Sequence, residues 1–180
     1  MSALTRSRRL AVVAAVVALV TGLSALVGLP TLAASSLGAA RSSYVEHCAG
    51  CHGIQGSSAP AQVPQLRGRV GYFLCTAEGR AYLIRLPNVS HAPISDNEEL
   101  AELMNFVVFG LGGASAPEGA LRFDAAEVAR LRKEPLTPGA SLVRIRRKIV
   151  DGLIRTCSAP ADLRGMYGSL AASRPAKEMR

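Results

Sequence analysis

Apolar and polar positions alternate most clearly over residues 95–113, where they predict a helix. Its start has the form of a capping box, because Ser95 can accept a hydrogen bond from an unpaired amide of the first turn and Glu98 can reach back. Acidic residues there also suit the positive end of the helix dipole. Glycines from Gly110 onward end the helix. The apolar residues between recur every three or four positions, as on one helical face: Leu100, Leu103, Met104, Val107 and Val108.

Three further segments have helical character. Residues 42–52 predict a short helix that ends at Gly53, and a capping pair, Asp124 and Glu127, opens another. A third begins near residue 141 and has one apolar and one largely basic face. Those faces hold Leu142, Ile145, Ile149 and Leu153 against Arg144, Arg146, Arg147 and Lys148.

The first forty residues have the order of a secretory leader. Basic residues precede an uncharged apolar stretch, residues 10–29, and small residues follow. That order predicts a signal peptide cut between about residues 33 and 40. The apolar stretch is also long enough to cross a bilayer as a helix, so an uncleaved membrane anchor remains open. Either way, residues 1–40 direct the rest of the chain out of the cytoplasm.

One short motif carries the chemistry. Cys48, Cys51 and His52 form a single Cys-x-x-Cys-His. Two thiols on one helical turn can each add to a vinyl group of a haem, and the histidine after the second is then held beneath the iron. We therefore expect one haem c, joined covalently through Cys48 and Cys51, with His52 as the proximal iron ligand. Aromatic residues are only 4% of the chain, and a buried haem would supply apolar volume that the core lacks.

Other uses of the cysteines fit less well. A structural zinc site needs four ligands, usually as two close pairs, whereas Cys75 and Cys157 are far from the motif and from each other. A thioredoxin-like pair belongs in an alternating strand and helix pattern, which does not follow Cys51. Outside the cytoplasm Cys75 and Cys157 can form a disulfide that fastens the C-terminal segment to the rest, or remain two buried thiols. The sequence leaves both open.

A loop rich in glycine, serine and proline follows the motif and leads to Pro64. A histidine that ligates a metal usually donates its second ring N–H to a fixed acceptor. We predict that the Pro64 carbonyl is this acceptor for His52. The alternative is a proline that simply ends a loop.

Three further patterns accompany the motif: Tyr44 one turn before it, Val63-Pro64-Gln65-Leu66-Arg67-Gly68 with Tyr72 shortly after, and Ile94-Ser95-Asp96-Asn97-Glu98-Glu99-Leu100 at the late helix. With the motif they resemble a class I cytochrome c over residues 44–108. The resemblance implies an all-α fold in which the first and last helices cross and haem lies between loops, with Phe106 near Tyr44. Residues 41–115 would be the haem domain, and residues 116–180 an extra basic helical segment.

The chain departs from that family at the second axial position of the iron. Class I cytochromes supply a methionine from the loop before the last helix, but here no methionine lies between Met1 and Met104. In the matching loop, residues 86–94, the only strong donor is His91, which we predict as the sixth ligand. Ligation by Met104 is a second possibility, and a five-coordinate iron open to small ligands is a third. His91 would then be a surface histidine.

Three residues between the motif and that loop suit the carboxylates of haem. A planar guanidinium pairs well with a carboxylate, so Arg80 and Arg85 are predicted partners of the haem propionates. Tyr82 between them can donate a hydrogen bond there. The alternative is a solvated charged edge.

Positive charge is concentrated in the C-terminal segment of a chain whose net charge is +8. From residue 121 onward there are thirteen basic residues and six acidic ones, whereas residues 42–120 hold four and seven. A basic face steers an acidic redox partner into brief encounters. Attraction to a membrane surface and a merely solvated face are the alternatives. No basic patch interleaved with aromatic residues indicates nucleic-acid binding.

Leader, motif and resemblance together predict a periplasmic, monohaem electron carrier that is not itself an enzyme. It would pass single electrons from a periplasmic dehydrogenase to a downstream cytochrome or oxidase. Two rivals remain. One is a haem enzyme, or a protein that responds to gases or peroxide, with an open iron. The other is a haem subunit that its N-terminus anchors to a membrane complex.

Overall fold

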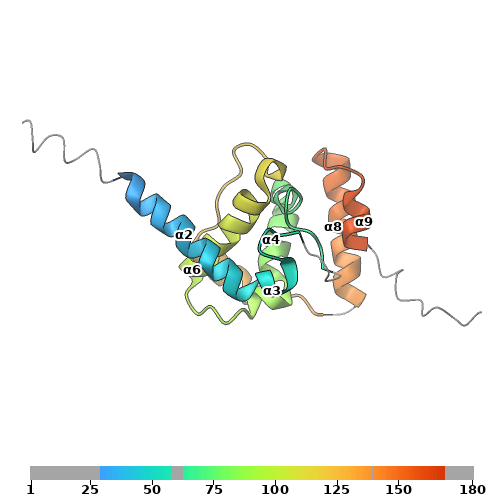
Figure 1. The fold of residues 1–180 in the computed structure, drawn as a ribbon. Helices are drawn as coiled ribbons and strands as arrows, with labels where there is room; N and C mark the ends of the chain where they lie inside the picture. Colours follow the sequence, from blue (N-terminus) through green and yellow to red (C-terminus); the bar gives the residue numbers. More distant parts are fainter. Residues whose placement is uncertain (1–28, 58–62, 139, 169–180) are drawn as a thin grey trace, which may run out of the picture. The chain divides into compact units, whose positions relative to one another are not determined.

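The computed structural model describes residues 29–57, 63–138 and 140–168. The predicted leader, apart from its last residues, lies outside this part of the chain. Contacts divide the chain into two units, residues 1–39 and 40–180, and the Cys-x-x-Cys-His motif belongs to the second. Every regular element in the described residues is helical (Figure 1), which confirms the predicted all-α class. Within those residues no helix is both long and apolar enough to cross a bilayer.

The Cys-x-x-Cys-His motif begins where one helix ends and another starts. Helix α2 (Leu29–His47) stops just before Cys48, and the single turn α3 (Ala49–His52) follows. Gly53 ends that turn with a φ of 72°, a left-handed conformation that glycine adopts without steric cost. Tyr44 is fully buried, and its hydroxyl donates a hydrogen bond of 2.7 Å to the Gly53 carbonyl. This bond joins the helix just before the motif to the residue just after it.

The late helix forms where the pattern predicted it, but its cap differs. Helix α6 spans Asn97–Asn105, and a π-helical stretch, η2 (Phe106–Leu111), continues it. The capping residue is Asp96, whose carboxylate accepts from the Glu98 amide at 2.9 Å, whereas the sequence predicted Ser95. A carboxylate satisfies the same unpaired amides and also complements the helix dipole.

The first and late helices meet through two side-chain contacts. The rings of Tyr44 and Phe106 lie 5.6 Å apart and are tilted by 56°, which is within the range of favourable aromatic pairs. Next to them, the Ser43 hydroxyl donates to the Glu99 carboxylate at 3.0 Å. The ring pair confirms the contact that the family resemblance implied.

In the described residues between the motif and the late helix there are three short elements: η1 (Val70–Cys75), α4 (Ala77–Arg85) and α5 (Pro87–Ser90). Thr76 caps α4, because its hydroxyl accepts from the Gly79 amide at 3.0 Å. These elements supply one wall of a cavity beside the motif.

Two glycines allow η1 to approach η2 closely. A Cβ atom at Gly71 would lie 2.4 Å from the Ala116 nitrogen, and one at Gly112 would lie 2.1 Å from the Val108 oxygen. Both distances are shorter than any real Cβ contact, so neither position accepts a side chain unless the backbone moves. The Gly71 amide also donates to the buried Ser115 hydroxyl at 3.0 Å.

The C-terminal segment is helical, as predicted. The Asp124 carboxylate accepts from the Glu127 amide at 2.7 Å, which confirms the predicted cap of α7, the first of the three α-helices in the described part of this segment. A 3₁₀ turn comes before them. The elements are η3 (Gly113–Ser115), α7 (Ala125–Leu131), α8 (Ala140–Thr156) and α9 (Leu163–Gly168).

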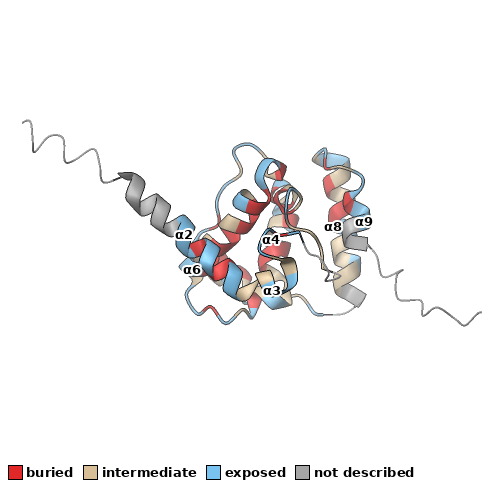
Figure 2. Ribbon diagram, in the orientation of Figure 1, coloured by how far each residue is buried: buried red, intermediate tan, exposed pale blue. Residues whose placement is uncertain are grey.

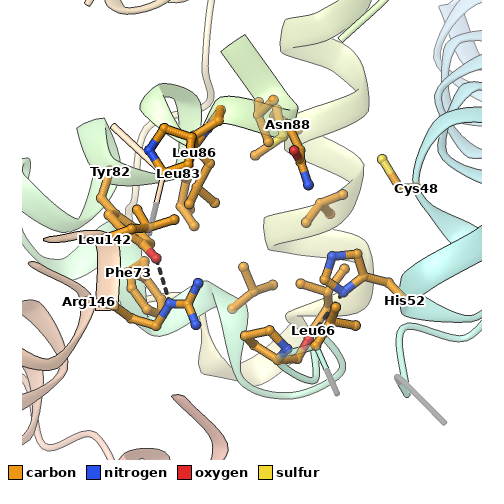
Figure 3. A pocket seen from close by; sticks show the side chains of 18 residues that line it. Cys48, His52, Leu66, Phe73, Tyr82, Leu83, Leu86, Asn88, Leu142 and Arg146 are labelled. Carbon is orange, nitrogen blue, oxygen red and sulfur yellow. Dashed lines mark hydrogen bonds between the residues drawn. The ribbon is translucent and has the colours of Figure 1, made fainter. Parts of the chain in front are cut away.

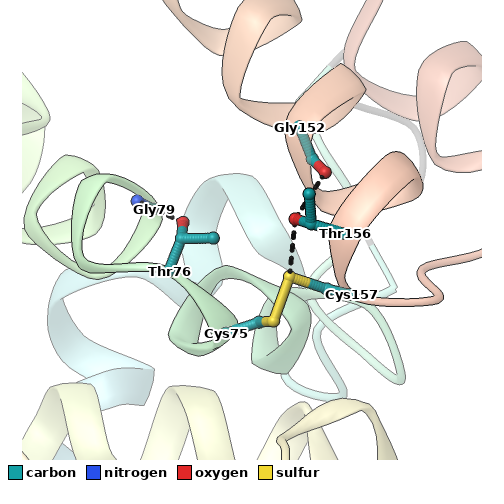
Figure 4. Close-up of a disulfide and its surroundings, with 6 residues drawn as sticks. All are labelled: Cys75, Thr76, Gly79, Gly152, Thr156 and Cys157. Atoms are coloured by element: carbon teal, nitrogen blue, oxygen red, sulfur yellow. Dashed lines mark hydrogen bonds between the residues drawn. A yellow bond between two sulfur atoms is a disulfide. The ribbon is translucent and has the colours of Figure 1, made fainter.

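Helices α8 and α9 bury apolar side chains and are fastened covalently. Cys75 at the end of η1 forms a disulfide with Cys157, 82 residues later, just after α8 (Figure 4). The sequence left this pairing open. The buried residues of α8 and α9, part of the set coloured red in Figure 2, are Ile149, Val150, Leu153 and Leu163.

Arg132, just after α7, holds the loop that precedes the late helix. Its guanidinium donates to the carbonyls of Ser90, Ala92 and Ile94 at 3.0, 3.2 and 2.9 Å. Such contacts cross residue 115, the predicted boundary between the haem domain and its extension. That boundary stays a prediction.

Candidate functional site

A cavity of about 390 Å³ lies beside the Cys-x-x-Cys-His motif (Figure 3). Its volume falls in the range of cofactor sites, about 300–1,000 Å³. Most of its lining is apolar, and the described lining includes no carboxylate. The lining side chains come from the motif, from the loop at Pro64, and from η1, α4, α5, α6, η2 and α8.

His52 enters this cavity with one ring nitrogen already engaged. Its Nδ1 lies 3.1 Å from the Pro64 carbonyl, and a carbonyl oxygen can only accept, so the proton is on Nδ1. Burial lowers the pKa of His52, although the bond to Pro64 opposes this shift. The ring is therefore neutral at pH 7, with the Nε2 lone pair available. This is the state in which an imidazole binds a metal.

The two cysteines of the motif are free thiols in different surroundings. Cys48 is half-buried and lines the cavity, whereas Cys51 is exposed. Burial, together with the neighbouring Cys51, raises the pKa of Cys48 to about 11. Redox-active cysteines in such a motif usually have a lowered pKa, so the thioredoxin-like alternative gains no support.

A zinc site also gains no support from the described residues. Cys75 and Cys157 are joined to each other and cannot serve as thiolate ligands. Over the described ranges, no group of three or more His, Cys, Asp or Glu side chains is arranged to hold a metal ion.

Of the residues predicted to contact the haem propionates, only Tyr82 reaches the cavity. Its hydroxyl accepts a hydrogen bond of 2.7 Å from Nε of Arg146, a residue of α8. Burial raises the pKa of Tyr82, and the contact with Arg146 opposes this only in part. The phenol is therefore neutral at pH 7.

The structure does not bring Arg80 and Arg85 to the cavity. The Arg80 guanidinium binds both carboxylate oxygens of Glu127, at 2.7 and 2.6 Å, and also donates to two backbone carbonyls. Arg85 donates to the Glu134 carbonyl at 2.6 Å and lies 3.8 Å from that residue's carboxylate. Both arginines thus connect α4 to the C-terminal segment.

His91 lies outside the cavity and Met104 lines it. The His91 side chain is exposed, and its Nδ1 donates to the Pro87 carbonyl at 3.0 Å. Met104 is buried, with 4% of its surface exposed. Helix α5, just before His91, contributes Pro87, Asn88 and Val89 to the wall instead.

Sequence reasoning missed the contribution of α8 to this site. Leu142 and Arg146 line the cavity, on the side opposite Cys48 and His52 (Figure 3). A signal was present: Arg146 recurs at helical spacing with Leu142, Ile149 and Leu153, so it lies on the same face as these apolar residues, where the structure leaves it half-buried. It was assigned to the basic outer face with its three neighbours because of its charge.

The residues present fit a covalently bound haem. An apolar cavity of cofactor size contains a neutral imidazole with a free Nε2, and one thiol of the attachment motif stands on its wall. Imidazole is the usual proximal ligand of haem iron, and apolar surroundings favour burial of the macrocycle.

Sequence comparison gives two related proteins. Both are named cytochrome c-552 and come from Thermus thermophilus. Each is 32% identical to this chain over 120 aligned residues, which cover 57% of this chain and 90% or 80% of the relative. No family model and no solved structure matches the chain.

Proposed function

Because the chain belongs to the c-type cytochromes, we propose that it binds one haem c covalently and carries single electrons. The observation that supports this most strongly is the geometry of His52. Its ring is fixed by the Pro64 carbonyl and presents Nε2 to an apolar cavity next to Cys48.

Each part of the motif has a separate role in this proposal. Cys48 and Cys51 bind the haem through thioether bonds, and His52 ligates its iron. The bound haem supplies one-electron chemistry, while the chain sets ligation, burial and access. Pro64 holds the imidazole in one tautomer, and the apolar walls exclude water from the iron.

The donor and the acceptor would be proteins of the same compartment. We infer a periplasmic dehydrogenase as donor and a cytochrome or oxidase as acceptor. Arg144, Arg147 and Lys148 are exposed along α8, where they would steer an acidic partner at a rate that falls with salt. Residues 1–40 would export the chain to the periplasm, either as a cleaved signal or as an anchor in the inner membrane.

The second axial position has two candidate residues. His91 is the ligand proposed from the sequence, but its side chain would have to turn away from Pro87 to reach the iron. Met104 already lines the cavity and is the second candidate. Replacing the true ligand, by His91→Ala or Met104→Leu, should convert the oxidised spectrum from low spin to high spin. The variant whose spectrum stays unchanged eliminates its residue.

A second candidate function follows from the position of His91, which is exposed and outside the cavity. If neither residue ligates, the iron is five-coordinate and the protein is a haem enzyme or responds to a small ligand. The absorption spectrum separates the two functions. A low-spin spectrum that carbon monoxide leaves unchanged, with reversible one-electron titration, is expected for the carrier. A high-spin spectrum that shifts at once on adding carbon monoxide would contradict it.

A further inference from the structure

Arg146 places a permanent positive charge on the wall of an apolar cavity. It is the only Arg or Lys among the described residues that line the cavity. Figure 3 shows its guanidinium directed toward the space between the walls, across from His52. Arg146 is half-buried, and even partial removal of a charge from water is costly unless an opposite charge meets it.

No carboxylate of the described chain meets this charge. Other arginines of the C-terminal segment, such as Arg122 and Arg164, have acidic partners at 2.9 and 2.6 Å. Arg146 forms no such ion pair within the described residues, and its Nε donates to the neutral Tyr82 hydroxyl. A hydroxyl accepts one hydrogen bond but does not neutralise a guanidinium.

The helix that carries Arg146 is fixed near both of its ends. Before α8, the Leu136 amide donates to the Arg85 carbonyl at 2.8 Å. After α8, Cys157 is joined to Cys75. Together with the Tyr82 hydroxyl, these contacts hold the guanidinium at one place in the cavity before anything binds there.

We propose that Arg146 is the anion-binding residue of this cavity and pairs with a carboxylate of the group bound in it. The guanidinium has two N–H edges that match the two oxygens of a carboxylate. The inference rests on the proposed function, because the expected source is a propionate of the covalent haem. A small free anion that enters the cavity has the same chemistry and is the other source.

The test for the expected source compares two charge-removing variants of the intact haem protein. Arg146→Gln removes the charge at the cavity. Arg155→Gln, also on α8 but exposed, removes the same charge elsewhere. Loss of a cation that pairs with a propionate disfavours the reduced haem. In a buffer without carboxylates, Arg146→Gln should lower the equilibrium constant for reduction about tenfold, a fall of about 59 mV in midpoint potential. Arg155→Gln should change it less than twofold.

Two further variants separate pairing from a structural role. Arg146→Lys keeps the charge without the planar fork and should recover most of the potential. Tyr82→Phe removes the acceptor that orients the guanidinium and should give a smaller fall in the same direction. Thermal unfolding of each variant shows whether its fold is intact. If Arg146→Gln does not fold, the midpoint potential of Arg146→Lys is compared with that of the parent protein instead.

Acetate binding, followed by isothermal titration calorimetry, distinguishes the other source. If the partner is a free anion, the two Gln variants share one potential, but acetate binds Arg146→Gln at least about tenfold more weakly than Arg155→Gln. Equal potentials together with equal acetate affinities would overturn the inference. That result differs from failure of the proposed function, in which the parent protein carries no covalent haem at all.

Discussion

The two sides of the cavity are built in different ways. The His52 side comes from a few consecutive residues and one loop carbonyl, so its chemistry can be read locally. The opposite side joins α4 to α8, and its contact between Tyr82 and Arg146 spans 64 residues. The first side depends on local geometry, whereas the second depends on the C-terminal helices staying in place. Substitutions that weaken the packing of the C-terminal helices should therefore disturb the contact between Tyr82 and Arg146 and leave the geometry of His52 unchanged.

The largest effect is expected from loss of the disulfide. Cys75→Ser with Cys157→Ser opens a loop of 82 residues, and the chain-entropy model gives a loss of about 4.5 kcal/mol in the free energy of unfolding. Urea unfolding followed by circular dichroism measures it. Haem should stay attached, because Cys48 and Cys51 are untouched. An unchanged unfolding midpoint would show that packing alone holds the C-terminal helices.

Packing of α8 should be the next largest contribution. Leu153 is fully buried, so Leu153→Ala should lower the free energy of unfolding by about 2–5 kcal/mol. Leu121→Ala is the matched control, since Leu121 is 79% exposed, and its effect should stay within about 0.5 kcal/mol. Equal effects of the two substitutions would mean that α8 does not pack against the core.

A smaller effect is expected on the His52 side. Tyr44→Phe deletes the hydroxyl that bonds the Gly53 carbonyl and should cost about 1–2 kcal/mol of unfolding free energy. Tyr72→Phe, at a half-buried ring, is the control and should cost less. The Arg146 and Tyr82 contact should survive in both variants, because it belongs to the other side.

Tyr44 also predicts an alkaline loss of stability. Burial, with a smaller contribution from Cys48, raises the pKa of Tyr44 to about 12 from 10.0. Below pH 10 both the folded and the unfolded chain keep the phenol proton. Between pH 10 and 12 only the unfolded chain releases it, so the folded state loses stability as pH rises. The free energy of unfolding, measured with denaturant between pH 10 and 12, should fall less steeply with pH in Tyr44→Phe than in the parent protein.

Much of the His52 side was predictable because it depends on short-range chemistry. The contact of Tyr44 with Phe106 followed from a family pattern. Outside this side, the cap of α7 at Asp124 followed from local capping rules. The cap of α6 was misassigned by one residue, since Ser95 and Asp96 are both good capping residues and only the path of the backbone decides between them.

The opposite side was not predictable for a different reason. Pairing of Cys75 with Cys157 depends on how close two distant segments come, which spacing does not reveal. Arg80 and Arg85 had the right chemistry for a propionate, but their acidic partners are more than 40 residues away in sequence. Arg146 lies at helical spacing from apolar residues of α8, but because it is charged it was assigned to the basic face of that helix.

The central claim is that one haem is joined by thioether bonds to Cys48 and Cys51. The most direct measurement is the mass of the purified protein, produced with export and haem maturation, before and after extraction with acidified organic solvent. The mass should exceed that of the chain by one haem, and the pigment should stay with the protein. A protein with the mass of the chain alone, or a pigment that moves into the solvent, would contradict the account.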